Sequence, residues 1–261
     1  MSQDLPHGES WFSFFGFHDT FLENARRMQA AMSPDGLTWY AHEEVGVQHV
    51  FGLLTVLAVL LFFGIRTYSQ IKDTEAAIVP EGKFSIRTFV ELFTGYVYNQ
   101  MASMMGKDAA KVFLPLIGTA AFVIFFSNLL GIMPFFPVPT TNFNTTLAFA
   151  LVIFFATHIF GIKKHGFGYA KQFLGPFLPL APLMLLIELI SHIARPITLA
   201  IRLMANMAAD HLVLGIFIGL VPFIVPLPIY ALGCIVITVQ TLVFCLLSTV
   251  YISMAISEDG H

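Results

Sequence analysis

The fold is decided by the apolar stretch PFLPLAPLMLLIELISHIARPITLAIRLMANMAADHLVLGIFIGLV, residues 176–221. As one helix, this stretch would be about 69 Å long, more than twice the roughly 30 Å thickness of a bilayer's hydrocarbon core. A single upright helix is therefore excluded. The stretch forms either one steeply tilted or kinked helix, or two helices broken near Arg195 and Pro196, where proline removes a backbone hydrogen-bond donor.

The rest of the chain is also strongly apolar. Of its 261 residues, 57% are hydrophobic and 11% are charged, whereas a soluble domain carries about 25% charged residues. Several other stretches approach the roughly 20 residues that a membrane-spanning helix needs. We therefore predict an all-α polytopic membrane protein with an amphipathic helix along the interface at 88–105, and with spans at 45–65, 111–131, 143–162, 176–221 and 229–256.

Charge predicts how the chain crosses the membrane. Residues 1–44 are polar and acidic, and we interpret them as an extracytoplasmic segment. Cytoplasmic loops hold the excess of Lys and Arg in membrane proteins, and nine of the 13 basic residues fall on one side of the predicted spans. The N-terminus is therefore expected outside and the C-terminus inside. The nine are Arg66, Lys72, Lys83, Arg87, Lys107, Lys111, Lys163, Lys164 and Lys171.

Composition and motifs argue against several other functions. The formal net charge of −3 and the lack of a basic patch give no indication of nucleic-acid binding. The nine histidines form no HExxH motif and no close-spaced triple, and no glycine-rich phosphate loop is present. We therefore expect neither a metal nor a cofactor, and look for the chemistry in the polar residues inside the apolar stretch.

These polar residues gather on one side of the long stretch. On a helical wheel, seven of them share an arc of roughly 100°: Glu188, Ser191, His192, Arg195, Arg202, Asn206 and Asp210. The wheel puts His211 alone on the opposite face. Glu188 and Arg195, seven residues apart, can neutralise each other as a structural ion pair.

Arg202 lacks such a neighbour. The nearest carboxylate on its own helical face belongs to Asp210, about 12 Å along the axis. A partner must come from another helix or another chain, and a charged residue at this depth is costly enough to favour a functional role. The last span offers Gln240, with Tyr251 on the same face. For the other polar groups at membrane depth, Ser127, Asn128, Thr157 and His158, we expect structural hydrogen bonds.

The segment from Pro196 to Leu212, PITLAIRLMANMAADHL, together with Gln240 in ITVQTLVF, resembles subunit a of the F-type ATP synthases. The resemblance extends from about residue 45 to the C-terminus and includes SNLLGIMP (127–134) and YISMA (251–255). It implies two long tilted helices beside a ring of c subunits, and so favours a single helix over 176–221. It also implies b-type peripheral stalk subunits and the rest of the synthase as partners, and a location in the bacterial inner membrane.

The resemblance also implies roles for individual residues. The family's essential arginine corresponds to Arg202, its helix neighbour to Asn206, its inner acid to Glu188 and its last-helix glutamine to Gln240. A ring carboxylate would arrive protonated from lipid, meet Arg202, release its proton into one aqueous half-channel and be reprotonated from another. Ser191, His192, Asp210, His211 and Tyr251 are further candidates for the proton path.

This chain departs from the family pattern in the outer half-channel. Many bacterial relatives carry Glu where this chain has His211 and Gly where it has Asp210, and many place His or Glu where it has Gly233. We therefore expect Asp210 and His211 to serve the outer half-channel, with Asp210 projecting into the space beside Gly233. Proton is the expected coupling ion, since no cluster of oxygen ligands for sodium is visible.

Two other functions are compatible with a polytopic membrane protein. An ion channel or secondary transporter could use Arg202 to bind an anion at the midplane, but such folds often contain paired halves or matching broken helices, and neither is visible. A purely structural membrane anchor would leave Arg202 without a purpose.

Overall fold

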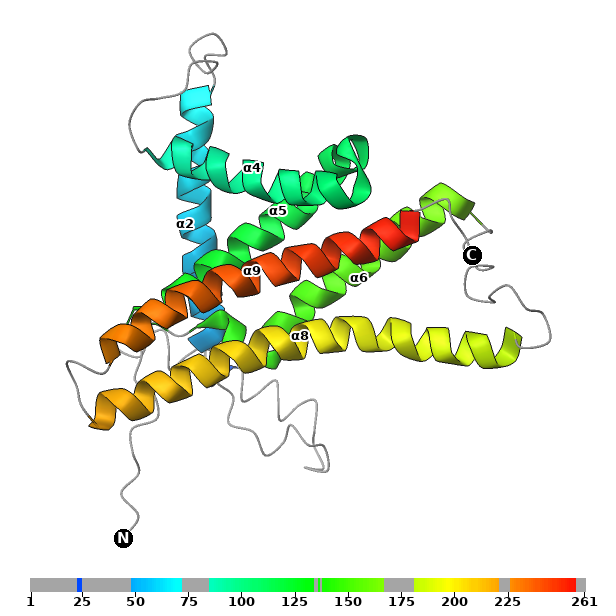
Figure 1. Ribbon diagram of the computed structural model, residues 1–261. Coiled ribbons are helices and arrows are strands. Elements are labelled where there is room, and N and C mark those ends of the chain that lie inside the picture. Colours follow the sequence, from blue (N-terminus) through cyan, green and yellow to red (C-terminus); the bar gives the residue numbers. More distant parts are fainter. Residues whose placement is uncertain are drawn as a thin grey trace.

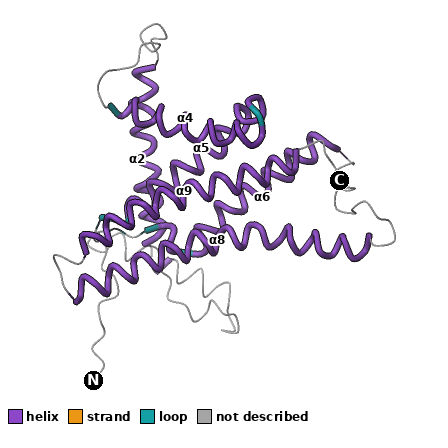
Figure 2. The backbone as a smooth tube through the Cα atoms, viewed as in Figure 1, coloured by secondary structure: helices purple, strands orange, loops and turns teal. Residues whose placement is uncertain are grey.

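The computed structural model describes residues 23–24, 48–71, 85–133, 136, 138–166, 181–220 and 226–256. These residues form long helices, and no strand occurs among them (Figure 2). The predicted interfacial position of residues 1–44 lies outside this description, apart from residues 23 and 24. The long helices are α2 (Gln48–Ile71), α4 (Ile86–Met105), α5 (Lys107–Leu130), α6 (Phe143–His165), α8 (Ala181–Leu220) and α9 (Pro226–Ile256).

Five of these helices are long and apolar enough to cross a membrane, which confirms the predicted all-α architecture. The candidate spans are His49–Ile71, Lys107–Leu130, Phe143–Lys164, Leu185–Phe217 and Leu227–Ile256. Helix α2 continues to Ile71, beyond the predicted limit at residue 65. The apolar pattern marks where hydrocarbon contact ends, whereas backbone hydrogen bonding can carry a helix several residues further.

The 40 residues of α8 form one continuous helix that contains Pro196. This settles the choice between one helix and two. Proline removes one donor from the helix interior, but membrane helices tolerate it where neighbouring helices and local adjustments compensate. Figure 1 shows α8 bending along its length without a break, and α8 and α9 running obliquely to α2 as two long neighbours.

Helices α5 and α6 form the predicted hairpin. Between them lies the short 3₁₀ helix η3 (Pro139–Thr141). The side chain of Asn142 caps α6 by accepting a hydrogen bond from the backbone N–H of Asn144, at 2.9 Å. Helix α4 packs against α2, α5 and α9 and is not among the candidate spans. Its first turn is capped by Ser85, which accepts from the Thr88 N–H.

One cluster of buried apolar side chains, which we call the central cluster, joins α5, α6, α8 and α9. Contacts of this kind are the packing that fixes how far apart and at what angle the long helices sit. Its residues are Ile124, Ala150, Ile153, Leu199, Ala200, Leu203 and Phe244.

Candidate functional site

Arg202 lies on the outer surface of the bundle, near the middle of the candidate span Leu185–Phe217. Its own helix buries the opposite side: Ala200 and Met207 are 0% and 2% exposed. The guanidinium makes no hydrogen bond or ion pair with any residue that the structure describes. The chain therefore presents a cation to whatever lies beside it at membrane depth.

Asn206 and Gln240 join the two long helices one turn beyond Arg202. The Asn206 Nδ2 donates a hydrogen bond to Gln240 Oε1 at 2.7 Å, and Gln240 is only 5% exposed. From the sequence we expected Gln240 to act beside Arg202. In the structure the Gln240 side-chain oxygen accepts the hydrogen bond from Asn206, and this bond holds α9 against α8 one turn from Arg202.

A cluster of charged and aromatic groups occupies the N-terminal half of α8. The Glu188 Oε1 lies 3.3 Å from His192 Nδ1 and 3.5 Å from Arg195 Nη2. The Arg195 guanidinium stands over the Tyr251 ring, 5.5 Å from its centroid, a cation–π arrangement that links α8 to α9. The ion pair expected between Glu188 and Arg195 thus has His192 as a third member. Ser191 is half-buried beside it.

A small cavity of about 20 Å³ adjoins this cluster. We call it the His158 pocket. It lies between α6, α8 and α9, and a volume of roughly 10–15 Å³ is enough for one water molecule. Its polar lining is Thr157 and His158 from α6, His192 and Arg195 from α8, and Tyr251 from α9.

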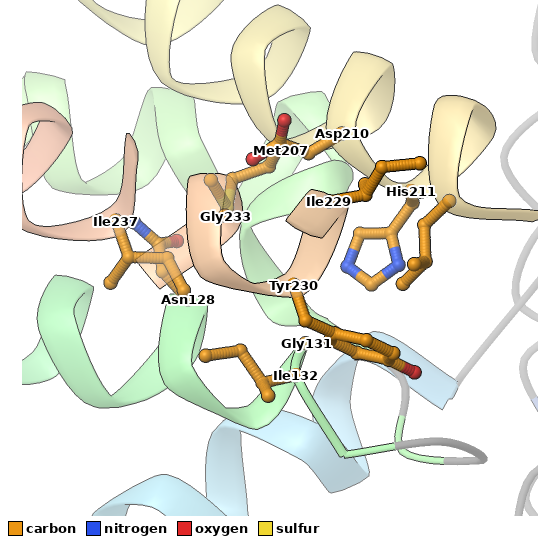
Figure 3. A pocket seen from close by; sticks show the side chains of 11 residues that line it. Asn128, Gly131, Ile132, Met207, Asp210, His211, Ile229, Tyr230, Gly233 and Ile237 are labelled. Carbon is orange, nitrogen blue, oxygen red and sulfur yellow. The ribbon is translucent and has the colours of Figure 1, made fainter. Parts of the chain in front are cut away.

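The second cavity, of about 30 Å³, lies at the other end of α8 and is called the Asp210 pocket. Figure 3 shows Asp210 and His211 coming from α8, Asn128 and Gly131 from α5, and Tyr230 from α9 around it. Gly233 of α9 also lines it, and a Cβ added there would meet no atom within 4 Å. Open space beside Gly233 thus lies in the same pocket as Asp210.

His211 lines the same pocket as Asp210 although the helical wheel puts it on the face opposite the polar stripe. In the structure this opposite face lies against the residue that follows α5: a Cβ on Gly131 would be 2.6 Å from His211 Nε2. Because α5 and α9 close around this end of α8, residues 100° apart on the wheel line the same pocket.

Sequence reasoning missed the part that Asn128 and His158 play in the two pockets. Asn128 Oδ1 does accept the expected kind of structural hydrogen bond, from Thr140 Oγ1 at 2.6 Å. Its Nδ2 is buried with no partner among the described residues, and Asn128 lines the Asp210 pocket. The available signal was a polar residue at membrane depth, which by itself does not separate a structural bond from a pocket lining.

The two pockets stand on either side of Arg202 along α8. The His158 pocket takes residues 192–199 of the helix and the Asp210 pocket takes residues 207–214. Between them lie Arg202 and the central cluster. Two small cavities, each with several polar side chains in its lining, are thus separated by a permanent cation on the outside and by apolar packing within. In the part of the chain that the structure describes, no three His, Cys, Asp or Glu side chains could hold a metal ion.

Comparison with known proteins gives one consistent result. Residues 50–253 match the family model for the ATP synthase A chain. The chain is 41% identical over 242 residues to ATP synthase subunit a of Sorangium cellulosum, covering 92% of each protein. It is 40% identical over 250 residues to that of Geotalea uraniireducens, covering 96% of this chain and 98% of that one. It is also 45% identical over 202 residues to that of Citrifermentans bemidjiense, covering 77% and 86% respectively.

Proposed function

Since the chain belongs to the family of ATP synthase subunit a, the proton-translocating stator of the membrane sector, we propose that Arg202 separates two proton half-channels. The Asp210 pocket belongs to one half-channel and the His158 pocket to the other. The observation that carries this proposal is the surface guanidinium, which has no partner among the described residues and lies between two pockets that polar side chains help to line. Membership of this family argues against the two alternatives, a monomeric transporter that binds an anion at Arg202 and a structural anchor.

The partner of Arg202 is a carboxylate on the c-subunit ring. A guanidinium keeps its proton at every accessible pH, so Arg202 attracts a carboxylate without accepting or releasing protons. A lone carboxylate in hydrocarbon is too costly to persist. Ring acids therefore enter lipid only in the neutral form, and the charged form exists only where it faces this chain.

Protons enter by the Asp210 pocket, which we assign to the outer half-channel. Asp210 and His211 are the titratable groups of its lining, and Asn128 and Tyr230 supply polar atoms. Asp210 takes the place that an acid or histidine from α9 holds in relatives, since Gly233 leaves that space open. A ring carboxylate leaving Arg202 on this side is reprotonated from the pocket.

Protons leave by the His158 pocket, which we assign to the inner half-channel. A ring carboxyl that approaches Arg202 gives its proton to the group formed by Glu188 and His192, helped by the polar atoms of Ser191 and Tyr251. Arg195 balances the charge of Glu188 and is held in place by Tyr251. Each proton that crosses in this way carries about 2.3 kcal/mol per 100 mV of membrane potential.

The proposal also includes the orientation of the chain, its membrane and its partner subunits. The excess of basic residues puts the C-terminus in the cytoplasm and residues 1–44 in the periplasm of a bacterial inner membrane. Besides the c-ring, b-type stalk subunits hold the chain against rotation. The membrane domain covers residues 45–261.

Replacing Arg202 tests the proposal. In inverted membrane vesicles that contain the whole synthase, Arg202→Ala should abolish ATP-driven acidification while ATP hydrolysis persists. Arg202→Lys should fail too, because a desolvated lysine can lose its proton where arginine cannot. Arg66→Ala removes an exposed arginine near the end of α2 and serves as the control. Pumping at the parent rate in Arg202→Ala would contradict the proposal.

A further inference from the structure

We propose that His158 of α6 is a proton-carrying residue of the inner half-channel, receiving protons from the Glu188 and His192 group. The inference deepens the function proposed above and rests on it. Neither the family resemblance nor the helical pattern of α8 points to this residue, because it comes from a different helix. The evidence is its place in the structure.

His158 stands directly against His192 in the pocket. The two imidazole rings meet edge to face, with centroids 5.1 Å apart and planes at 83°. Both line the same cavity. His192 in turn has its Nδ1 3.3 Å from Glu188 Oε1. Three titratable groups therefore form a continuous row that leads from α8 across to α6.

One backbone contact decides which nitrogen of His158 can act. Its Nδ1 lies 2.8 Å from the carbonyl oxygen of Phe154, one turn earlier in α6. A carbonyl oxygen only accepts hydrogen bonds, so Nδ1 carries a hydrogen and donates it. In the neutral ring Nε2 is then the basic nitrogen. His158 is held in one tautomer, with Nε2 as the atom that gains and loses a proton.

The pocket provides the connection between the rings. Proton transfer needs direct hydrogen-bond contact or a single bridging water. The cavity of about 20 Å³ is large enough for one water, which needs roughly 10–15 Å³. In each transfer one O–H or N–H bond breaks and another forms. His158 becomes an imidazolium when Nε2 takes the proton and returns to neutral when water removes it.

The position of His158 in α6 gives the row a direction. Lys163 and Lys164 lie in the last turn of this helix, about 7.5 and 9 Å further along its axis, and both are exposed. They belong to the basic group that marks the cytoplasmic side. His158 thus lies between the polar group on α8 and the end of the membrane span, where protons must emerge.

If His158 served only in packing, another aromatic residue could replace it. The ring stacks near Phe154, with centroids 4.2 Å apart, and a phenylalanine would keep that contact. It could not bind or release a proton. His158→Phe therefore preserves volume and aromatic packing while removing the base, and His158→Ala removes both and leaves space that a small base can enter.

The test uses membrane vesicles that contain the complete synthase, with proton flow followed by a pH-sensitive dye. We expect both variants to lower ATP-driven proton flow about a hundredfold, the low end of what a positioned proton-transfer group contributes. Millimolar imidazole in the buffer should raise the flow in His158→Ala toward the parent value and leave His158→Phe low. Phe155→Ala, which alters an exposed ring of α6 (58% exposed), should match the parent with and without imidazole.

Two results would overturn the inference: parent-like flow in His158→Phe, or a loss in His158→Ala that imidazole does not reverse. Arg202→Ala in the same vesicles separates this from the function proposed above. If Arg202→Ala stops proton flow and His158→Phe does not affect it, only the role of His158 is wrong. If Arg202→Ala leaves proton flow intact, the half-channel proposal itself is wrong.

Discussion

Asp210 and Gly233 line the same pocket from two helices, and Asp210 is the one carboxylate in the lining that the structure describes. We expect Asp210→Asn to slow proton pumping about tenfold or more, because an amide keeps the shape but cannot carry a proton. Asp108→Asn, which alters an exposed acid in the first turn of α5, is the matched control. Acidification rates in inverted vesicles measure both. Equal effects of the two substitutions would contradict the assignment.

Gly131 lies where His211 enters its pocket, and its lack of a side chain is required there. An added Cβ would be 2.6 Å from His211 Nε2, 2.9 Å from Val138 Cγ2 and 3.0 Å from the Asn128 carbonyl oxygen. We expect Gly131→Ala to destabilise the protein by about 1–3 kcal/mol, as overpacking typically does. Thermal unfolding of the complex in detergent measures this.

A double-mutant cycle shows whether His211 is the side chain that gives way. In His211→Ala the nearest obstacle is gone, so adding Gly131→Ala should cost clearly less stability than in the parent. Identical costs in both backgrounds would mean that the backbone of Asn128 and the Val138 side chain set the limit instead.

At the level of single residues, the sequence indicates which side chains are unusual at membrane depth but not which residues they contact. The polar stripe on α8 and the lack of an acid near Arg202 follow from spacing on one helix. The partners follow from packing between helices, which spacing does not contain. The bond from Asn206 to Gln240 and the contact of His158 with His192 are examples of partners that spacing on one helix does not reveal.

Among the elements, α6 and α9 are tied together at their ends by one lysine. Lys164 Nζ donates to the Ile256 carbonyl oxygen at 2.8 Å, where the last carbonyls of α9 lack helical partners. A cation at a helix C-terminus contributes about 0.3–1 kcal/mol. We expect Lys164→Ala to lower stability by that amount and to speed proteolysis at the end of α9.

Lys163→Ala is the control for this contact. The neighbouring lysine is also exposed but makes no hydrogen bond with a described residue, so its removal should leave both measurements unchanged. A similar loss in the two variants would attribute the effect to net charge rather than to the capping bond.

The helices themselves were predictable where composition alone decides them. Five candidate spans and the hairpin of α5 and α6 agree with the apolar pattern. The path of residues 176–221 was not decided by pattern, because proline in a membrane helix can either break it or be tolerated. In the structure, Pro196 lies buried in the continuous helix α8, whose neighbours Leu199 and Ala200 belong to the central cluster.

The proposed orientation of the whole molecule places the start of α6 outside the membrane and its end inside. In a background without Cys234 and Cys245, cysteines placed at Asn144 and Lys163 mark the two ends of α6, and both positions are exposed. An impermeant maleimide should label Asn144→Cys in right-side-out vesicles and Lys163→Cys in inverted ones. Labelling of both from the same side would mean that α6 does not span.

The central cluster has a consequence for how the complex is built. Leu199, Ala200 and Leu203 lie buried between the two cavities, and neither cavity reaches the other along the described part of α8. In the function proposed above, charge then passes between them only on the c-ring. A copy inserted before that ring is therefore expected to be electrically silent, so that assembly would not discharge the gradient that powers the motor.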